Sequence, residues 1–333
     1  MYIRQILKDD SNGWVNFLKL FFTIIITLIF TTVFSYPHFI AMENKFISKG
    51  WLLENFVTKH QEYSEFMINL QATLQMASLD FNSLMQILEP NLNLFLMLLG
   101  FVGMLLAVIL CNKFINGNTF LSLTTSRNKI DFSRIFFSFF IWGSFSAIMI
   151  ILGYFLMPEN YVVNFNLEPF LILFFIVVFL IPIQTSAEEY VFRGYMMQNL
   201  GIITGNRWFP LIVSSLAFGL LHLANPEIEK FGNVVLIFYI GSGLFAGIMT
   251  LMDEGMELAL GWHAANNMIA ALLVTADWTA LQTHSVLKDI SNPESMPISD
   301  VLIPVLIFFP LVLYIFSKKY NWSNWGEKLF GKI

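Results

Sequence analysis

Long apolar stretches recur along this chain, and they constrain its fold more than any other feature. A hydrocarbon core of about 30 Å is crossed by roughly 20 residues in a helix. About eight stretches fit this requirement; they cover residues 15–36, 91–111, 134–157, 169–190, 209–224, 234–252, 257–275 and 300–317. Runs such as 170–182 lack the polar–apolar alternation that a membrane-spanning barrel needs. The sequence therefore predicts an all-α, polytopic transmembrane helical bundle of about eight crossings.

The composition agrees with residence in a membrane. Hydrophobic residues make up 56% of the 333 residues and charged residues only 12%, whereas a soluble domain carries about 25% charged residues. So few charges cannot cover a water-facing surface, so we expect most of the surface to face lipid. The net charge of −5 excludes a nucleic-acid-binding protein, and the single cysteine excludes a disulfide-stabilised scaffold.

The basic residues predict the orientation in the membrane. An even number of crossings places both termini on one side. If that side is inside, 13 of the 18 Lys and Arg residues lie at the inner face, as the positive-inside rule requires. The other five are Lys45, Lys49, Lys59, Lys230 and Lys288. We therefore expect both termini to be cytoplasmic and the first stretch to be an uncleaved anchor.

Two parts of the chain are expected to differ in role. Residues 1–130 would hold two transmembrane helices joined by an amphipathic outer loop at about 37–90, which would cap the bundle or gate access of a substrate. Residues 131–333 would form a core of about six transmembrane helices. The polar residues that could perform chemistry all fall in this second part.

Charged residues are costly at bilayer depth, at about 2.5–3.5 kcal/mol each on insertion scales, so their positions are informative. The fourth stretch continues into Glu188, Glu189 and Arg193. Glu189 and Arg193 are four positions apart, so they share a helix face and can form an ion pair. Glu188 is rotated by about 100° from its neighbour and is left available for chemistry.

Two later stretches carry histidines, His222 in the fifth and His263 in the seventh, with Asn267 four positions after His263. If the chain turns near residue 205, Glu188 lies 17 positions before the turn and His222 lies 17 after it. An antiparallel hairpin would then place them at one level. We expect the three motifs to converge in a water-accessible cavity that opens on the cytoplasmic side, with the termini.

Each motif alone also has an ordinary structural interpretation. The Glu–Arg cluster could be an interfacial ion pair, and the lone histidine a hydrogen-bonded bundle residue. The His–Asn pair could be an interhelical hydrogen bond. We favour a functional site because the hairpin would place these polar motifs at the same level of the bundle.

Such residues admit two mechanisms. Glu188 could deprotonate a water with the help of His222, while His263 and Asn267 donate hydrogen bonds to the oxyanion. Alternatively, Glu188, His222 and His263 could ligate a divalent metal, of which Zn²⁺ fits best, and leave one position for an activated water. The sequence has no HExxH pattern, and it leaves both mechanisms open.

In their order along the chain, three motifs resemble those of the CPBP intramembrane proteases. These motifs are Glu188-Glu189-x-x-x-Arg193, Phe218-x-x-x-His222 and His263-x-x-x-Asn267. The family is also called the CAAX-protease and bacteriocin-processing, or Abi, family, and it includes the eukaryotic type II CAAX prenyl proteases. The resemblance covers roughly residues 130–318.

The resemblance implies a role for each motif residue. Glu188 would be the catalytic glutamate, and His222 its partner on the water or metal. His263 and Asn267 would stabilise the oxyanion or bind metal. The supporting residues would be Glu189 and Arg193.

The implied function is that of an intramembrane endopeptidase, with or without metal, which cleaves a membrane-associated protein or peptide. A Phe-, Ile- and Asn-rich composition suggests a bacterial inner (plasma) membrane. The expected partners are the lipid bilayer, the substrate and a membrane protein, with no nucleic acid. One alternative is a non-proteolytic membrane subunit or bacteriocin-immunity scaffold with the same fold. An ion-coupled transporter would need inverted repeats, which this sequence does not show.

Overall fold

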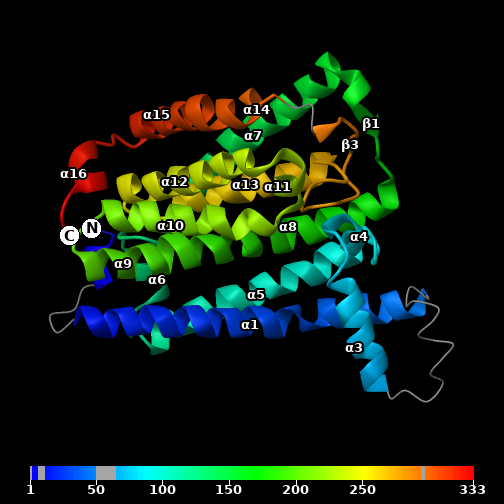
Figure 1. The fold of residues 1–333 in the computed structure, drawn as a ribbon. Coiled ribbons are helices and arrows are strands. Elements are labelled where there is room, and N and C mark those ends of the chain that lie inside the picture. The colour runs from blue at the N-terminus through cyan, green and yellow to red at the C-terminus, as the bar shows by residue number, and fades with distance from the viewer. Residues whose placement is uncertain (1, 7–11, 50–64, 294–296) are drawn as a thin grey trace.

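The computed structural model describes residues 2–6, 12–49, 65–293 and 297–333. Over these residues the chain forms a bundle of long helices with one very small sheet (Figure 1). All eight predicted stretches are helical: α1 (Gly13–Ser48), α5 (Pro90–Phe114), α7 (Phe132–Leu156), α8 (Leu167–Glu189), α10 (Trp208–Leu221), α12 (Leu236–Asp253), α13 (Glu257–Leu273), and α14 (Ser299–Ile303) with α15 (Phe309–Lys319). The all-α polytopic bundle is confirmed.

The helices differ in length, and the two shorter ones position the histidines of the candidate site. Among the described residues, six helical segments are long and apolar enough to cross a membrane. One of them is α8, which continues through a π-helical turn (Tyr190–Met196) into α9 (Met197–Thr204). The shorter helices α10 and α13 have 14 and 17 residues. His222 directly follows α10 and His263 lies within α13, so the short helices position both histidines.

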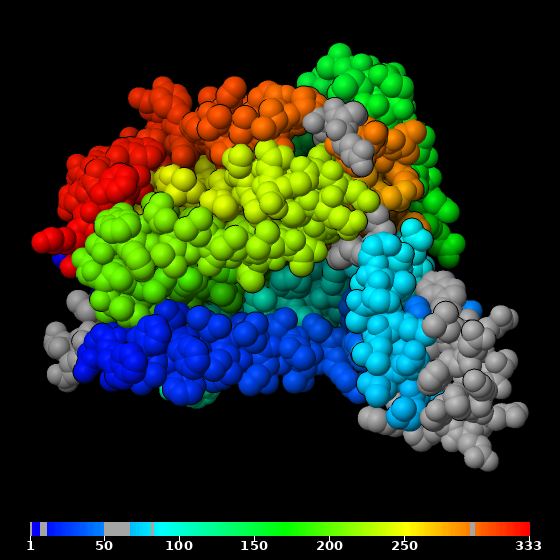
Figure 2. Space-filling model, in the orientation of Figure 1, coloured from blue at the N-terminus to red at the C-terminus, as the bar shows by residue number. Residues whose placement is uncertain are grey.

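Helix α8 lies in the middle of the bundle. It packs against α5 on one side and against α13 on the other, while α1 covers α5 and α7 covers α13 (Figure 1). Helix α1 runs along one edge of the molecule (Figure 2). Its outer surface exposes large apolar side chains such as Phe21, Phe22 and Leu28. An apolar outer face of this kind is what a lipid environment favours.

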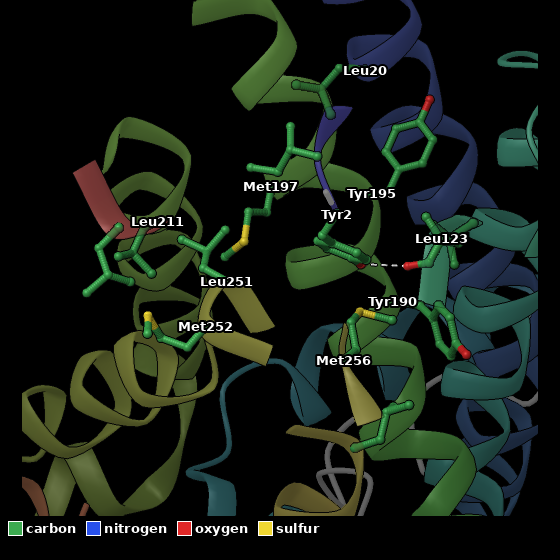
Figure 3. Packing of buried hydrophobic residues seen from close by; sticks show 14 residues of the cluster. Tyr2, Leu20, Leu123, Tyr190, Tyr195, Met197, Leu211, Leu251, Met252 and Met256 are labelled. Carbon is green, nitrogen blue, oxygen red and sulfur yellow. Dashed lines mark hydrogen bonds between the residues drawn. The ribbon is translucent and has the colours of Figure 1, made fainter. Parts of the chain in front are cut away.

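Both termini lie at one end of the bundle (Figure 1). Tyr2 is buried in an apolar cluster (Figure 3); its hydroxyl donates to Leu123 O at 2.6 Å and its backbone N–H donates to the Glu254 carboxylate. Near the C-terminus, Lys332 pairs with Asn206 in the turn between α9 and α10. The expectation that the termini share a side therefore holds. Their location on the cytoplasmic side stays a prediction.

The opposite end of the bundle holds the small sheet. Strand β1 (Tyr161–Val163) pairs antiparallel with β3 (Leu287–Asp289), and β3 pairs parallel with β2 (Val274–Thr275). The sheet joins the connection between α7 and α8 to the segment that follows α13. The short helix α11 (Pro226–Phe231) connects α10 to α12 at this end.

The predicted outer loop is only partly described. Helix α1 extends to Ser48, well beyond the predicted end of the first stretch at residue 36. The loop also contains α3 (Glu65–Met76) and α4 (Phe81–Met85). A small core joins them to α1; it contains Phe46, Ala72, Met76, Ile87 and Leu88. The part of this predicted amphipathic loop at residues 50–64 lies outside the described residues.

The packing of α13 against α7 depends on Gly261. A Cβ atom added at this glycine would lie 2.0 Å from the backbone oxygen of Ile135, so the two helices could not keep their distance. We expect Gly261→Ala to destabilise the protein by about 1–3 kcal/mol, measured as thermal unfolding in detergent. Gly326→Ala is the control, because nothing lies within 4 Å of its added Cβ atom. Equal unfolding temperatures for the two variants would contradict this expectation.

Candidate functional site

The imidazole of His263 lies between the two glutamates at the end of α8. Its Nδ1 atom is 2.8 Å from Glu189 Oε1, and its Nε2 atom is 3.5 Å from Glu188 Oε2. The His263 and Glu189 side chains are buried, and that of Glu188 is 13% exposed. Glu189 therefore accepts a hydrogen bond from Nδ1, which turns Nε2 toward Glu188. The structure thus brings together the first and third predicted motifs.

Glu189 also carries the predicted ion pair. Arg193 Nη1 donates to Glu189 Oε1 at 3.1 Å, and neither side chain is exposed. The guanidinium further donates to Gly243 O at 3.1 Å and lies 4.3 Å from the centre of the Phe218 ring. A buried carboxylate is stable only with partners such as these. Glu189 therefore remains a fixed negative charge that orients His263.

Gln184 links Glu188 to Asn267, and the sequence analysis missed it. Its amide nitrogen donates to Glu188 Oε1 at 2.7 Å, and its oxygen accepts a hydrogen bond from Asn267 Nδ2 at 3.0 Å. Asn266 extends this chain, since it donates to Asn267 Oδ1 at 3.1 Å and accepts from Trp142 Nε1 at 3.1 Å. Glu188 is therefore positioned through Oε1 while Oε2 accepts no hydrogen bond from the described residues.

His222 lies beside this group without joining it. Its Nδ1 atom donates to Phe218 O at 2.8 Å, which leaves Nε2 as the unprotonated nitrogen of the neutral ring. The ring of Phe218 contacts both imidazoles, with centroids 4.9 Å from His222 and 5.8 Å from His263. Among the described residues, no hydrogen bond or ion pair connects His222 to Glu188, although the two interact electrostatically.

The site residues lie in a segment that is similar to a known protein family. Residues 167–269 match a family model described as type II CAAX prenyl endopeptidase Rce1-like. This segment is similar to that family. It contains all three motifs, from Glu188 to Asn267, and we refer to it as the Rce1-like core. The resemblance inferred from the motifs is thereby confirmed over this segment.

A related protein extends the comparison beyond the core. The uncharacterized protein YyaK of Bacillus subtilis (strain 168) is 31% identical over 188 residues, which cover 56% of this chain and 63% of that protein. The match thus spans somewhat less than two thirds of the relative. No solved structure matches this chain.

The Rce1-like core does not present the predicted metal ligands as a metal site. In the part of the chain that the structure describes, no group of three or more His, Cys, Asp or Glu side chains is arranged to hold a metal ion. Catalytic zinc usually needs three protein ligands. The Nδ1 atoms of His222 and His263 are hydrogen-bonded, which leaves their Nε2 atoms as the possible ligand atoms. Glu188, His222 and His263 as placed do not fit a zinc centre. Zinc dependence stays a prediction.

A cavity adjoins the candidate site at the end of the bundle away from the termini. This cavity of about 540 Å³ adjoins the Rce1-like core at Tyr239, whose ring stacks on His222 with a centroid distance of 4.2 Å. Tyr239 lies near the first residue of α12, whereas the last residue of α12 lies beside the turn that contacts Tyr2. The adjoining cavity is therefore at the end away from the termini. Glu188, His222 and His263 are not among its described lining residues, so the expected opening of the site on the side of the termini stays a prediction.

Proposed function

We propose that this protein is an intramembrane endopeptidase of the CAAX-protease type, acting on a peptide bond of a membrane-associated protein or peptide. The observation that carries the proposal is the pairing of Glu188 Oε2, buried and without a hydrogen bond, with His263 Nε2 at 3.5 Å. A buried carboxylate oxygen that accepts no hydrogen bond calls for an explanation, and here that oxygen is the one next to His263. Such a group is suited to act as a general base.

The reaction would begin with Glu188 as the base. Oε2 would take a proton from a water, and the water oxygen would attack the carbonyl carbon of the scissile bond. Gln184 holds Oε1 at 2.7 Å and so keeps Oε2 directed to the water. His222 Nε2 would accept the second proton of the water in a hydrogen bond, since Nδ1 is committed to Phe218 O.

The tetrahedral intermediate would be stabilised by His263. With its Nδ1–H bonded to Glu189, the ring can carry a second proton on Nε2 and donate it in a hydrogen bond to the oxyanion. Asn267 donates one N–H to Gln184 and carries a second one that could serve the same oxyanion. The C–N bond would then break as Glu188 returns its proton to the leaving amine.

Comparison of cells tests this function. Cells with the wild-type protein and cells with Glu188→Gln would be compared for peptides whose ends differ. We expect at least one membrane-associated protein to be shortened only in wild-type cells. Identical peptide ends in both would favour the non-proteolytic subunit or immunity scaffold.

We assign the protein to a bacterial inner (plasma) membrane, in line with the related Bacillus protein.

Treatment with a chelator tests whether cleavage depends on a bound metal ion. Because Glu188, His222 and His263 as placed do not form a three-ligand site, we expect cleavage by the purified protein to survive prolonged dialysis against a chelator. The measurement is the cleavage rate together with zinc per chain. Equimolar zinc that is lost in parallel with activity, and restored with it, would instead assign the metal-dependent mechanism.

A further inference from the structure

The cavity beside His222 has a distinctive wall. It is lined by α11, the beginning of α12, α14 and the segment at Trp278, at the end of the bundle away from the termini. Four of its described residues are aromatic: Phe231, Phe238, Tyr239 and Trp278. Its volume of about 540 Å³ falls within the range of small-molecule and side-chain binding sites.

Glu227 and Trp278 contribute polar atoms to this wall. Glu227 accepts the backbone N–H of Ala280 through Oε1 at 2.9 Å, and the hydroxyl of Tyr239 also interacts with its carboxylate. The indole nitrogen of Trp278 is buried and donates no hydrogen bond. Burial raises the pKa of Glu227. A complementary ligand would therefore bring a donor for the carboxylate and an acceptor for the indole N–H.

The charged and aromatic residues that line the cavity indicate that the hydrogen-bond donor of the ligand is a cation. The described lining contains two acids, Glu227 and Asp300, and one base, Lys230, which lies 3.8 Å from Glu229. Phe231 and Trp278 meet edge to face with their centroids 5.0 Å apart. Aromatic walls next to a carboxylate are the usual environment of a bound organic cation.

The cavity also shares a wall with the candidate active site. Tyr239 lines the cavity, and its ring is stacked on His222 with an angle of 20° between the planes. The hydroxyl of Tyr239 is held by Asn225 Nδ2 at 3.2 Å. Successive residues of an extended peptide are about 3.3 Å apart, so a side chain in the cavity would belong to a residue close to the scissile bond.

We propose that this cavity binds a lysine or arginine side chain of the substrate peptide, with the cation on Glu227 and a neighbouring peptide carbonyl on the Trp278 indole N–H. The proposal rests on the proposed function, because it identifies the ligand as substrate. It specifies the substrate class as a peptide with a basic residue near the cleaved bond. A single residue of this type supplies a charged donor for Glu227 and an acceptor for the Trp278 indole N–H.

Binding of two small probes tests the site without cleavage. The probes are Nα-acetyl-lysine methylamide and its norleucine counterpart, which has a similar side-chain length and no charge. We expect the purified protein to bind the lysine probe at least about tenfold more tightly, because a charge-assisted hydrogen bond is lost with norleucine. Glu227→Gln should abolish this preference. Glu229→Gln is the matched control, since it removes a charge from the same helix at a side chain that is 58% exposed.

Several results would overturn the assignment. Equal affinities of the two probes for the wild type would do so, and so would a preference retained by Glu227→Gln with an unchanged unfolding temperature. Glycerophosphoethanolamine supplies the same ammonium group from a lipid. If it binds as tightly as the lysine probe and depends equally on Glu227, the ligand is a lipid headgroup and the peptide assignment is wrong.

The sequences of the cleaved sites test the cation-binding cavity separately from the protease activity. Sites cut by the wild type should be enriched in Lys or Arg at one fixed position, and Glu227→Gln should cut with that enrichment lost. Cleavage without any such enrichment would reject the cavity proposal and leave the protease intact. No cleavage by the wild type, together with a Glu227-dependent preference for the lysine probe over both other probes, would reject the protease and retain the cation site.

Discussion

Glu188→Gln is expected to lower the rate of peptide cleavage by about 10³-fold, because removal of a general base typically costs 10²–10⁴-fold. The glutamine has nearly the same shape and can still accept the hydrogen bond from Gln184. It cannot take a proton from water. The measurement is the single-turnover cleavage rate of the purified, reconstituted variant on a substrate found in the cellular comparison.

The control for this substitution lies on the same helix. Glu168 is exposed in the first turn of α8, far along the chain from the site. Glu168→Gln should retain the wild-type rate, and both variants should unfold at the wild-type temperature. Wild-type cleavage by Glu188→Gln would remove the proposed mechanism entirely.

Glu189→Gln is expected to destabilise the protein by about 3–5 kcal/mol and to abolish cleavage, because it leaves the guanidinium of Arg193 buried without its counter-ion. It also removes the negative charge that orients His263. The measurements are thermal unfolding in detergent and the cleavage rate. An unchanged unfolding temperature would contradict the buried ion pair.

A double variant separates the two effects. In Glu189→Gln with Arg193→Met, both charges of the pair are gone, and replacement of a whole buried pair is often close to neutral for stability. We expect much of the lost stability to return. Cleavage should stay low, because His263 Nδ1 would still lack its carboxylate. Recovery of both stability and cleavage would show that Glu189 is only structural.

Relations within one helix were predictable from the sequence, because helix geometry decides them. The Glu189–Arg193 pair follows from a spacing of four, and the structure confirms it. The apolar stretches gave the helices, and the midpoint near residue 205 placed Glu188 and His222 near each other. The π-helical turn at Tyr190–Met196 was not foreseen, because its sequence has no distinctive pattern.

Relations between helices were harder to predict. Gln184 lies one turn before Glu188, so its contact with that carboxylate had a spacing signal that we did not use. Its bond to Asn267, by contrast, depends on how α8 is aligned with α13, which no local pattern records. The side on which the site opens also depends on how the helices are arranged, and it stays a prediction.

The shortness of α10 has a consequence for the surrounding lipid. Fourteen helical residues extend about 21 Å, which is about 9 Å less than the hydrocarbon core of a typical bilayer. Lipid beside this helix must compress, or water must fill the difference. Where the lipid thins beside His222, a polar segment at the headgroup surface would have less far to descend to reach Glu188.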